Sequence, residues 1–171
     1  ARAGQNLASN PGFENATGTH VVDWREYNYG TTGGRLQVIN DPARARSGSK
    51  CVCLDSRRGY CCLMQGWGAP WAPGVYPGKR QQYLVKVHAK GTDCQLLVQL
   101  CIYDAKGERP KATPKDFKTE FRFPVTAQWQ EYVQPLTVPE GTTHLNLIVG
   151  GAAGNKGLLY VDDVGLYDAR E

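Results

Sequence analysis

The stretch LLYVDDVGLY, residues 158–167, sets the architecture of this chain. Its aromatic, branched and apolar residues predict a β-strand, which two adjacent carboxylates, Asp162 and Asp163, interrupt. In regular alternation Asp162 shares a face with Val164 and Leu166, which would point it toward a core. A buried carboxylate needs a partner charge, a set of donors or a metal ion. The first candidate to lie beside it is Glu14, in the turn of residues 10–14 near the other end of the chain.

Length and composition favour one globular domain over residues 1–171. No run approaches the ~18 apolar residues of a membrane helix. No charged and apolar leader stands at the start, so we expect any signal peptide to be absent or already removed. The net charge of +4 comes from 20 basic and 16 acidic residues, which are scattered along the chain. This distribution is typical of a solvated surface rather than of a nucleic-acid interface.

Short apolar runs alternate with turn signals along the whole sequence, which has 20 glycines and 10 prolines. No segment keeps apolar spacing at 3.6 residues over the length of a helix, so the pattern predicts an all-β sandwich. Alternation within residues 82–89, 94–103 and 144–149 predicts one inward face on each strand. Further strands are expected at residues 5–7, 21–27, 35–39, 51–54 and 60–65, the last returning antiparallel beside residues 51–54.

The six cysteines show no C-x-x-C spacing, which argues against a structural zinc site. We expect most of them to be buried thiols that act as small hydrophobic side chains. The alternative is a set of disulfides. If residues 55–59 form a hairpin loop, Cys53 would lie near Cys61 and a bridge between them would be possible.

The loop of residues 66–78 holds Trp67 and Trp71 among glycines and prolines that offer the two indoles little apolar surface. One of them could simply cap the sandwich. Exposed aromatic rings are also natural contact sites, so we predict that at least one indole stacks on a ligand.

Five motifs in order resemble a known family: NPGFE at residues 10–14, SGSK at 47–50, YPGK at 76–79 with QYLV at 82–85, WQEY at 129–132, and YVDDV at 160–164. The chain is similar over nearly its whole length to the carbohydrate-binding modules of families 4, 9, 16 and 22. These are galactose-binding-like sandwiches. The resemblance therefore implies a β-sandwich jelly roll of two antiparallel sheets.

The same resemblance implies a structural Ca²⁺ ion. Carried over to this sequence, its carboxylate ligands would be Glu14 and Asp162, with backbone carbonyls from Gly12 and Lys50. This mixture of oxygens suits a hard cation. The alternative is that the two carboxylates are only hydrogen-bonded or are paired with Arg46.

A sugar-binding face is the second implication, since sugars need aromatic platforms beside amide and guanidinium groups. Apart from the two indoles, the predicted ligand-binding residues are Tyr27, Gln95, Gln99, Tyr103, Arg122 and Asn146. The outward side chains of Gln82, Lys86 and His88 are expected on the same face. An ordinary solvated sheet face is the alternative.

No catalytic motif stands out: G-x-S-x-G and H-E-x-x-H are absent, and no carboxylate pair is recognisable as that of a glycosidase. We therefore expect a non-catalytic carbohydrate-binding module, monomeric within a larger secreted enzyme that degrades β-glucan, xylan or mannan. We expect it to bind polysaccharide or oligosaccharide, and neither nucleic acid nor membrane. The alternative is a protein–protein or adhesion module on the same sandwich, with the indoles as anchors.

Overall fold

The computed structural model describes residues 6–28, 33–66 and 82–169, which form strands and connecting loops. This part of the chain contains no helix, so no helix in it could cross a membrane. Its strands are β1 (Ala16–Thr17), β2 (His20–Val21), β3 (Arg25–Tyr27), β4 (Arg35–Asn40), β5 (Lys50–Asp55), β6 (Cys61–Gln65), β7 (Gln82–Gly91), β8 (Gln95–Tyr103), β9 (Glu120–Pro124), β10 (Gln130–Thr137), β11 (His144–Gly151) and β12 (Leu159–Asp168).

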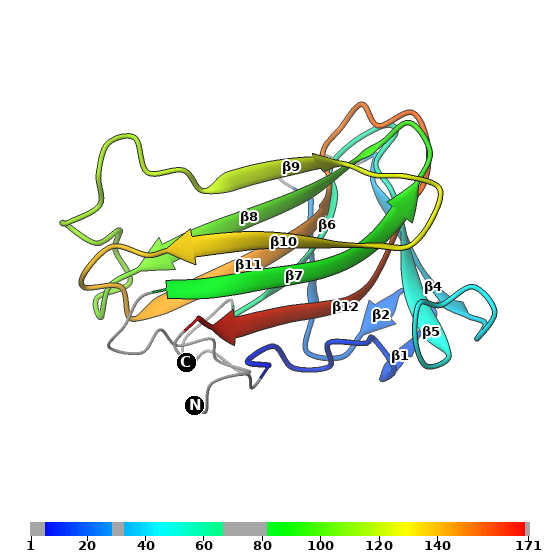
Figure 1. The fold of residues 1–171 in the computed structure, drawn as a ribbon, viewed down its shortest axis with the longest axis horizontal. Coiled ribbons are helices and arrows are strands. Elements are labelled where there is room, and N and C mark those ends of the chain that lie inside the picture. Colours follow the sequence, from blue (N-terminus) through cyan, green and yellow to red (C-terminus); the bar gives the residue numbers. More distant parts are fainter. Residues whose placement is uncertain (1–5, 29–32, 67–81, 170–171) are drawn as a thin grey trace.

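Two five-stranded antiparallel sheets form a β-sandwich jelly roll, which confirms the predicted fold class (Figure 1). One sheet has the strand order β10-β7-β12-β5-β4 and is called the β7 sheet below. The other has the order β3-β6-β11-β8-β9 and is called the β8 sheet. Strands β1 and β2 form a separate small ribbon.

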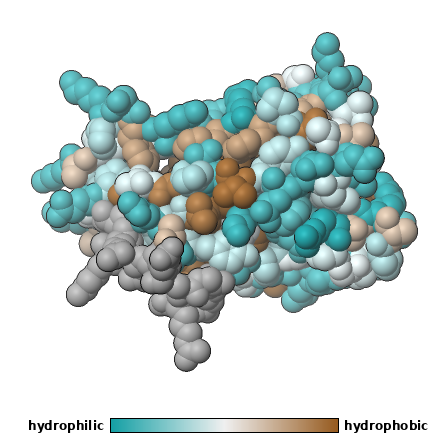
Figure 2. All heavy atoms as spheres, viewed as in Figure 1, coloured by the Kyte–Doolittle hydropathy of each residue, from teal (hydrophilic) through white to brown (hydrophobic). Residues whose placement is uncertain are grey.

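Side chains that alternate along the strands fill the space between the sheets. On β8 these are Leu96, Val98, Leu100 and Ile102. In the same way β7 contributes Tyr83, Val85, Val87 and Ala89, and β11 contributes Leu145, Leu147 and Val149. Outside, the surface is largely hydrophilic around an apolar area near the middle of the view in Figure 2. Val133 on β10, 40% exposed, is the one exposed large hydrophobic residue of the described chain.

The final strand departs from regular alternation at its two carboxylates. A β-bulge between Asp162 and Gly165 shifts the pairing of β12 with β7, and Asp163 has a φ of 47°. Val164 and Leu166 therefore do point into the core, but Asp162 pairs with His88 and lies on the outer face of the β7 sheet. The predicted orientation of Asp162 was wrong, because the extra residue inverts the alternation. Asp162 is nevertheless fully buried.

The two ends of the chain meet along β12, as the sequence suggested. Asn6 forms an isolated bridge with Tyr167, and the Leu7 amide donates to the Leu166 carbonyl at 2.7 Å. The Val164 amide donates to the carbonyl of Pro11 at 2.9 Å. The turn of residues 10–14 is thereby held against the bulge.

Three other expectations about the strands need correction. The segment 60–65 does not return beside β5, since β6 belongs to the opposite sheet. The segment 21–27 is divided into β2 and β3, with Trp24 buried between them, and the segment 5–7 contributes only the bridge at Asn6. A Cys53–Cys61 bridge is not formed. All six cysteines are free thiols, five of them buried, as expected.

Candidate functional site

The six predicted ligand-binding residues that the structure describes lie on the outer face of the β8 sheet. Strand pairing shows this for three of them, because direct partners share a face. Asn146 is opposite Cys101, Gln99 is opposite Ile148, and Tyr27 is opposite Cys62, and these partners lie outside the main core. The strands that carry the six residues are β3 (Tyr27), β8 (Gln95, Gln99, Tyr103), β9 (Arg122) and β11 (Asn146). Trp67 and Trp71 lie outside the described residues.

Apolar side chains form the floor of this outer face. Cys62, Met64, Leu97 and Ile148 are almost completely buried there, although they point away from the main core. Tyr27 and Tyr60 pack against them. Tyr60, Met64 and Ile148 were not among the predicted site residues. The only signal for Met64 and Ile148 was that each belongs to a strand whose alternate residues face the core, and Tyr60 directly precedes β6.

Asn146 is the least ordinary residue of this face. Its side chain is 0% exposed, yet among the described residues neither its amide nitrogen nor its amide oxygen has a hydrogen-bond partner. It lies beside Gly66, where a Cβ atom would come within 3.1 Å of the Asn146 Oδ1. A buried amide without partners costs about 1–3 kcal/mol of stability, so its presence here suggests that a ligand uses it.

Two tyrosine hydroxyls near Asn146 remain protonated well above neutral pH. Burial raises the pKa of Tyr103 to about 12, and the neighbouring Cys101 thiol adds to this shift. Burial and the thiols of Cys101 and Cys62 also raise the pKa of Tyr27. Both tyrosines therefore retain an O–H donor beside the apolar floor.

Arg122 and Gln95 lie toward the other end of the β8 sheet, where they line a cavity of about 450 Å³ together with Asn155 and Lys156. The guanidinium of Arg122 is paired with Glu120 at 2.6 Å. The Gln95 backbone is held by Asn155, whose Oδ1 accepts from the Gln95 amide at 3.0 Å. Along β8, Tyr103 therefore lies at one end of this face and Gln95 at the other.

Gln82, Lys86 and His88 do not join this face. They lie on β7 in the opposite sheet, so that part of the prediction was wrong. Alternation shows which side of a strand is outward, but not which sheet the strand joins.

The predicted metal ligands gather at another place, around the bulge of β12. Both carboxylate oxygens of Glu14 accept backbone hydrogen bonds, from Ser49 at 2.7 Å and from Lys50 at 2.9 Å. The Lys50 ammonium donates to the carbonyls of Glu14 and Ala16. Gly12 packs closely here, since a Cβ atom there would lie 3.2 Å from a side-chain oxygen of Asp163.

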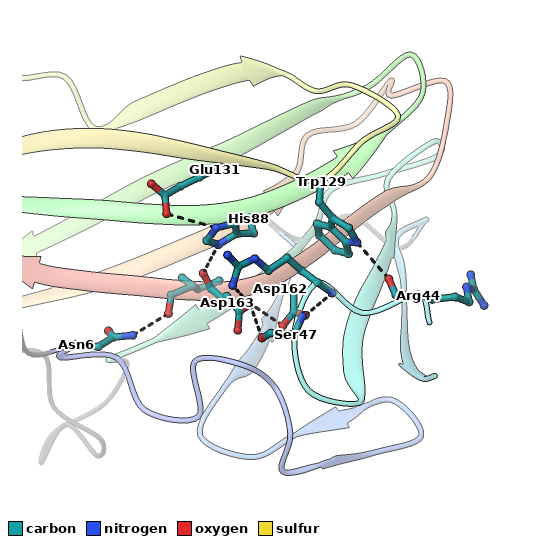
Figure 3. Close-up of polar contacts among 10 residues, drawn as sticks. Asn6, Arg44, Ser47, His88, Trp129, Glu131, Asp162 and Asp163 are labelled. Atoms are coloured by element: carbon teal, nitrogen blue, oxygen red, sulfur yellow. Dashed lines mark hydrogen bonds and ion pairs between the residues drawn. The ribbon is translucent and has the colours of Figure 1, made fainter. Parts of the chain in front are cut away.

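Asp162 receives three backbone hydrogen bonds, from Arg46 at 3.0 Å, Ser47 at 3.2 Å and Asp163 at 2.8 Å (Figure 3). The Arg46 guanidinium pairs instead with Asp163, at 3.2 Å. Burial, with a contribution from the charge of Asp163, raises the pKa of Asp162 to about 7. Asp162 is therefore a buried carboxylate held by amides, without a salt-bridge partner among the described residues.

This donor set fits a hard cation in its chemistry, because a buried carboxylate without a counter-charge gains most from one. Within the described ranges, no three side chains from His, Cys, Asp and Glu are grouped to hold a metal. A calcium ion would therefore rely on Asp162, Glu14 and backbone carbonyls such as those of Gly12 and Lys50. Its effect would be to fasten the turn of residues 10–14 and the loop of residues 44–50 to β12.

No protein-family model and no curated protein matches the sequence. Several solved structures match the fold. The enzymatically active domain of tailspike protein 4 from bacteriophage CBA120 aligns with a TM-score of 0.69 and 15% identity, over 95% of this chain and 21% of that one. The chain thus spans about a fifth of that protein.

Two carbohydrate-binding modules match over nearly their full length. A family 61 module, solved with β-1,4-galactotriose, has a TM-score of 0.60 and 19% identity, covering 98% of this chain and 99% of that one. The CBM22-1 xylan-binding domain of Xyn10C from Paenibacillus barcinonensis has a TM-score of 0.59 and 15% identity, covering 98% and 96%. At these identities the likeness shows the fold alone: the chain has the same β-sandwich fold as these two modules.

Proposed function

We propose that this chain binds a glycan on the outer face of the β8 sheet, without catalysing its cleavage. The observation that carries the proposal is Asn146, whose buried amide has no protein partner within the described chain. A sugar hydroxyl is both a donor and an acceptor, so hydroxyls can satisfy both ends of that amide. Because the amide is 0% exposed, a ligand reaches it only after the groups that cover it move.

The surroundings of Asn146 support a sugar rather than a purely apolar ligand. Tyr27 and Tyr60 lie against a floor of buried apolar side chains, which suits the C–H face of a sugar ring. The Tyr103 hydroxyl, Gln99 and Arg122 supply polar groups along the same sheet. Because these groups extend over three strands, β8, β9 and β11, we infer a ligand of several sugar units.

The class of glycan is inferred from the structural neighbours. Modules with this fold were solved with β-1,4-galactotriose or are xylan-binding domains. We propose a β-linked plant-type polysaccharide of the β-glucan, xylan, mannan or galactan kind. We further propose that the chain is a secreted, monomeric part of a larger glycan-degrading enzyme, whose local substrate concentration it raises.

A structural Ca²⁺ ion at Asp162 and Glu14 is part of the proposal. Its role would be to offset the burial of the Asp162 carboxylate and to fix the bulge, at a place distinct from the sugar-binding face. Ion binding and sugar binding are therefore separable by experiment.

Affinity electrophoresis against soluble xylan, mixed-linkage β-glucan, glucomannan and galactan tests the proposal. We expect retardation of the native protein by at least one of them, and none by an uncharged gel of non-glycan polymer. A protein that migrates unchanged in every polysaccharide would exclude the glycan proposal. It would favour the alternative of a protein–protein or adhesion module.

A further inference from the structure

The opposite sheet of the sandwich carries a second cluster of aromatic and charged side chains. Two cations, Arg44 and Lys90, stand over two aromatic rings, Trp129 and Tyr160, on the outer face of the β7 sheet. The Lys90 ammonium is 5.0 Å from the Trp129 ring centre and 5.5 Å from that of Tyr160. The Arg44 guanidinium is 5.6 Å from the Tyr160 ring centre, and its Nη2 donates to the Tyr160 hydroxyl at 3.3 Å.

These four residues come from four separate parts of the chain, namely the loop before β5, strand β7, the residue before β10, and strand β12. Lys90 and Tyr160 are direct partners in the pairing of β7 with β12. The Trp129 indole donates to the Arg44 carbonyl at 3.3 Å, a contact visible in Figure 3. Beneath them lies a small apolar cluster of Ile39, Cys51 and Cys53. The fold therefore places Lys90 beside Tyr160 and fixes the Arg44 backbone next to Trp129, while the Arg44 guanidinium reaches the Tyr160 hydroxyl.

A cavity of about 400 Å³ opens beside the two cations, lined also by Thr92, Ala127, Leu158 and Tyr160. That volume lies within the usual range of small-ligand sites, about 300–1,000 Å³. No carboxylate is among its described lining residues, and no ion pair within the described chain involves Arg44 or Lys90.

In a second cavity of the molecule, by contrast, the cations do have an acidic partner. The cavity lined by Arg35, Arg57 and Arg58 also contains Asp55, which pairs with Arg57 at 2.8 Å. Arg44 and Lys90 instead both lie over the Tyr160 ring, and neither forms an ion pair within the described chain. Their mutual repulsion is relieved by an anion placed between them.

We propose that this cavity binds an acidic sugar, with its anionic substituent between the Arg44 guanidinium and the Lys90 ammonium. A carboxylate or a sulfate group offers the same chemistry to these two donors. Thr92 and the Tyr160 hydroxyl lie within the same cavity for the sugar's hydroxyls, and Leu158 and Ala127 for its apolar face.

This site goes beyond the proposed sugar-binding face, and it lies on the other sheet. The two sites share no residue, so one molecule can hold a neutral glycan on one side and an acidic one on the other. The failure of either proposal leaves the other standing.

Calorimetric titration of the whole chain with oligogalacturonate tests the inference. Its fully methyl-esterified form serves as the neutral match, and a sulfated galactan oligosaccharide as the second anionic probe. We expect one or both anionic probes to bind, the neutral ester not to bind, and affinity to fall as salt is added. The two anionic probes then distinguish carboxylate from sulfate.

Lys90→Met keeps the apolar stem and removes the charge, and we expect it to lower affinity about tenfold to a hundredfold. Arg44→Gln, at an exposed position, provides a second variant with the same expected loss. The matched control is Lys118→Met, since the Lys118 ammonium also stands 5.0 Å from an aromatic ring centre, that of Phe121, but on the other sheet.

Each of the following results would overturn the inference. The first is that neither anionic probe binds. The second is that the neutral ester binds as well as the acid, or that Lys118→Met loses as much affinity as Lys90→Met. The third is that a single-stranded DNA oligonucleotide binds equally well with the same dependence on Lys90, which would make this a general polyanion surface. Retention of neutral-polysaccharide binding by Lys90→Met would support separate sites.

Discussion

The backbone amide of Arg46 donates a 3.0 Å hydrogen bond to the carboxylate of Asp162, which is 116 residues away in sequence. Together with the amide of Ser47, it folds the loop before β5 over the outer face of the β7 sheet. This contact explains how a carboxylate on the outer side of a sheet comes to be 0% exposed. The Asp162 carboxylate is therefore buried by this loop and not by the packing of the two sheets.

The stability of the metal-free protein should depend on pH through Asp162. Its pKa is about 7 in the folded protein and about 3.9 in an unfolded chain. The folded protein thus binds this proton more tightly. Its contribution to stability is complete below pH of about 4 and is lost as the pH rises toward 7. Asp162→Asn should flatten that decline, as measured by urea unfolding at a series of pH values in EGTA. An identical decline in wild type and variant would contradict the assignment.

Calcium should reverse the unfavourable burial of the Asp162 carboxylate. A ligand bound only by the native state adds RT ln(1 + [L]/Kd) to the free energy of unfolding. We expect EGTA to lower the melting temperature of the wild type and to leave that of Asp162→Ala unchanged. Asp116→Asn, at an exposed position away from the bulge, should respond like the wild type. An unaltered wild-type melting curve, with no metal in elemental analysis, would remove calcium from this account.

Gly48 should tolerate no side chain, for two separable reasons. Its φ is +61°, which costs other residues about 1–2 kcal/mol, and a Cβ would collide with the Glu14 carboxylate. Gly107, with φ of +80° and open space around it, is the matched control for strain alone. Gly48→Ala should therefore lower the free energy of unfolding more than Gly107→Ala. Equal losses would mean that the Glu14 contact contributes nothing.

The thiols of the native protein should be almost inert. Burial, with smaller contributions from neighbouring charges, raises the pKa of both Cys61 and Cys62 to about 12, and that of Cys51 to about 11. Because the thiolate is the reactive form, a thiol reagent at pH 8 should label the native chain slowly. After denaturation without reductant it should label all six cysteines. Absence of free thiols after denaturation would reveal three disulfides instead.

The sequence was sufficient to predict which residues of a strand face the core, but not which strands pair with one another. Leu96, Val98 and Leu100 predicted the inward face of β8 correctly, because burial on one face leaves a period of two in the residues themselves. The bulge at Asp162 left no such trace. It is set by how β12 pairs with β7, and pairing partners lie far apart in sequence.

The same distinction holds for the candidate site, of which one part was predictable from the sequence and another was not. Outward positions such as Gln99 and Asn146 were predictable from alternation, whereas the separation of His88 onto the other sheet was not. The short segment between β5 and β6 resembles a hairpin loop, yet it carries the chain across the sandwich. The cluster of Arg44, Lys90 and Tyr160 likewise exists only through the fold, since each residue alone has an ordinary local context.

The most direct test of the sugar-binding account is to measure both stability and glycan affinity for Asn146→Leu. If Asn146 is kept for its ligand, replacing an unpartnered buried amide with an apolar side chain should leave the free energy of unfolding unchanged or raise it, by up to about 1–3 kcal/mol. Affinity for the polysaccharide that retards the wild type should fall at least about tenfold.

Asn6→Leu is the matched asparagine control for that measurement. The Asn6 amide is hydrogen-bonded to the backbone of Val164 and Leu166, so this variant should lose stability and keep its affinity. The account predicts that the two variants behave in opposite ways, one losing binding and the other losing stability. An Asn146→Leu protein that binds the glycan as tightly as the wild type would contradict it.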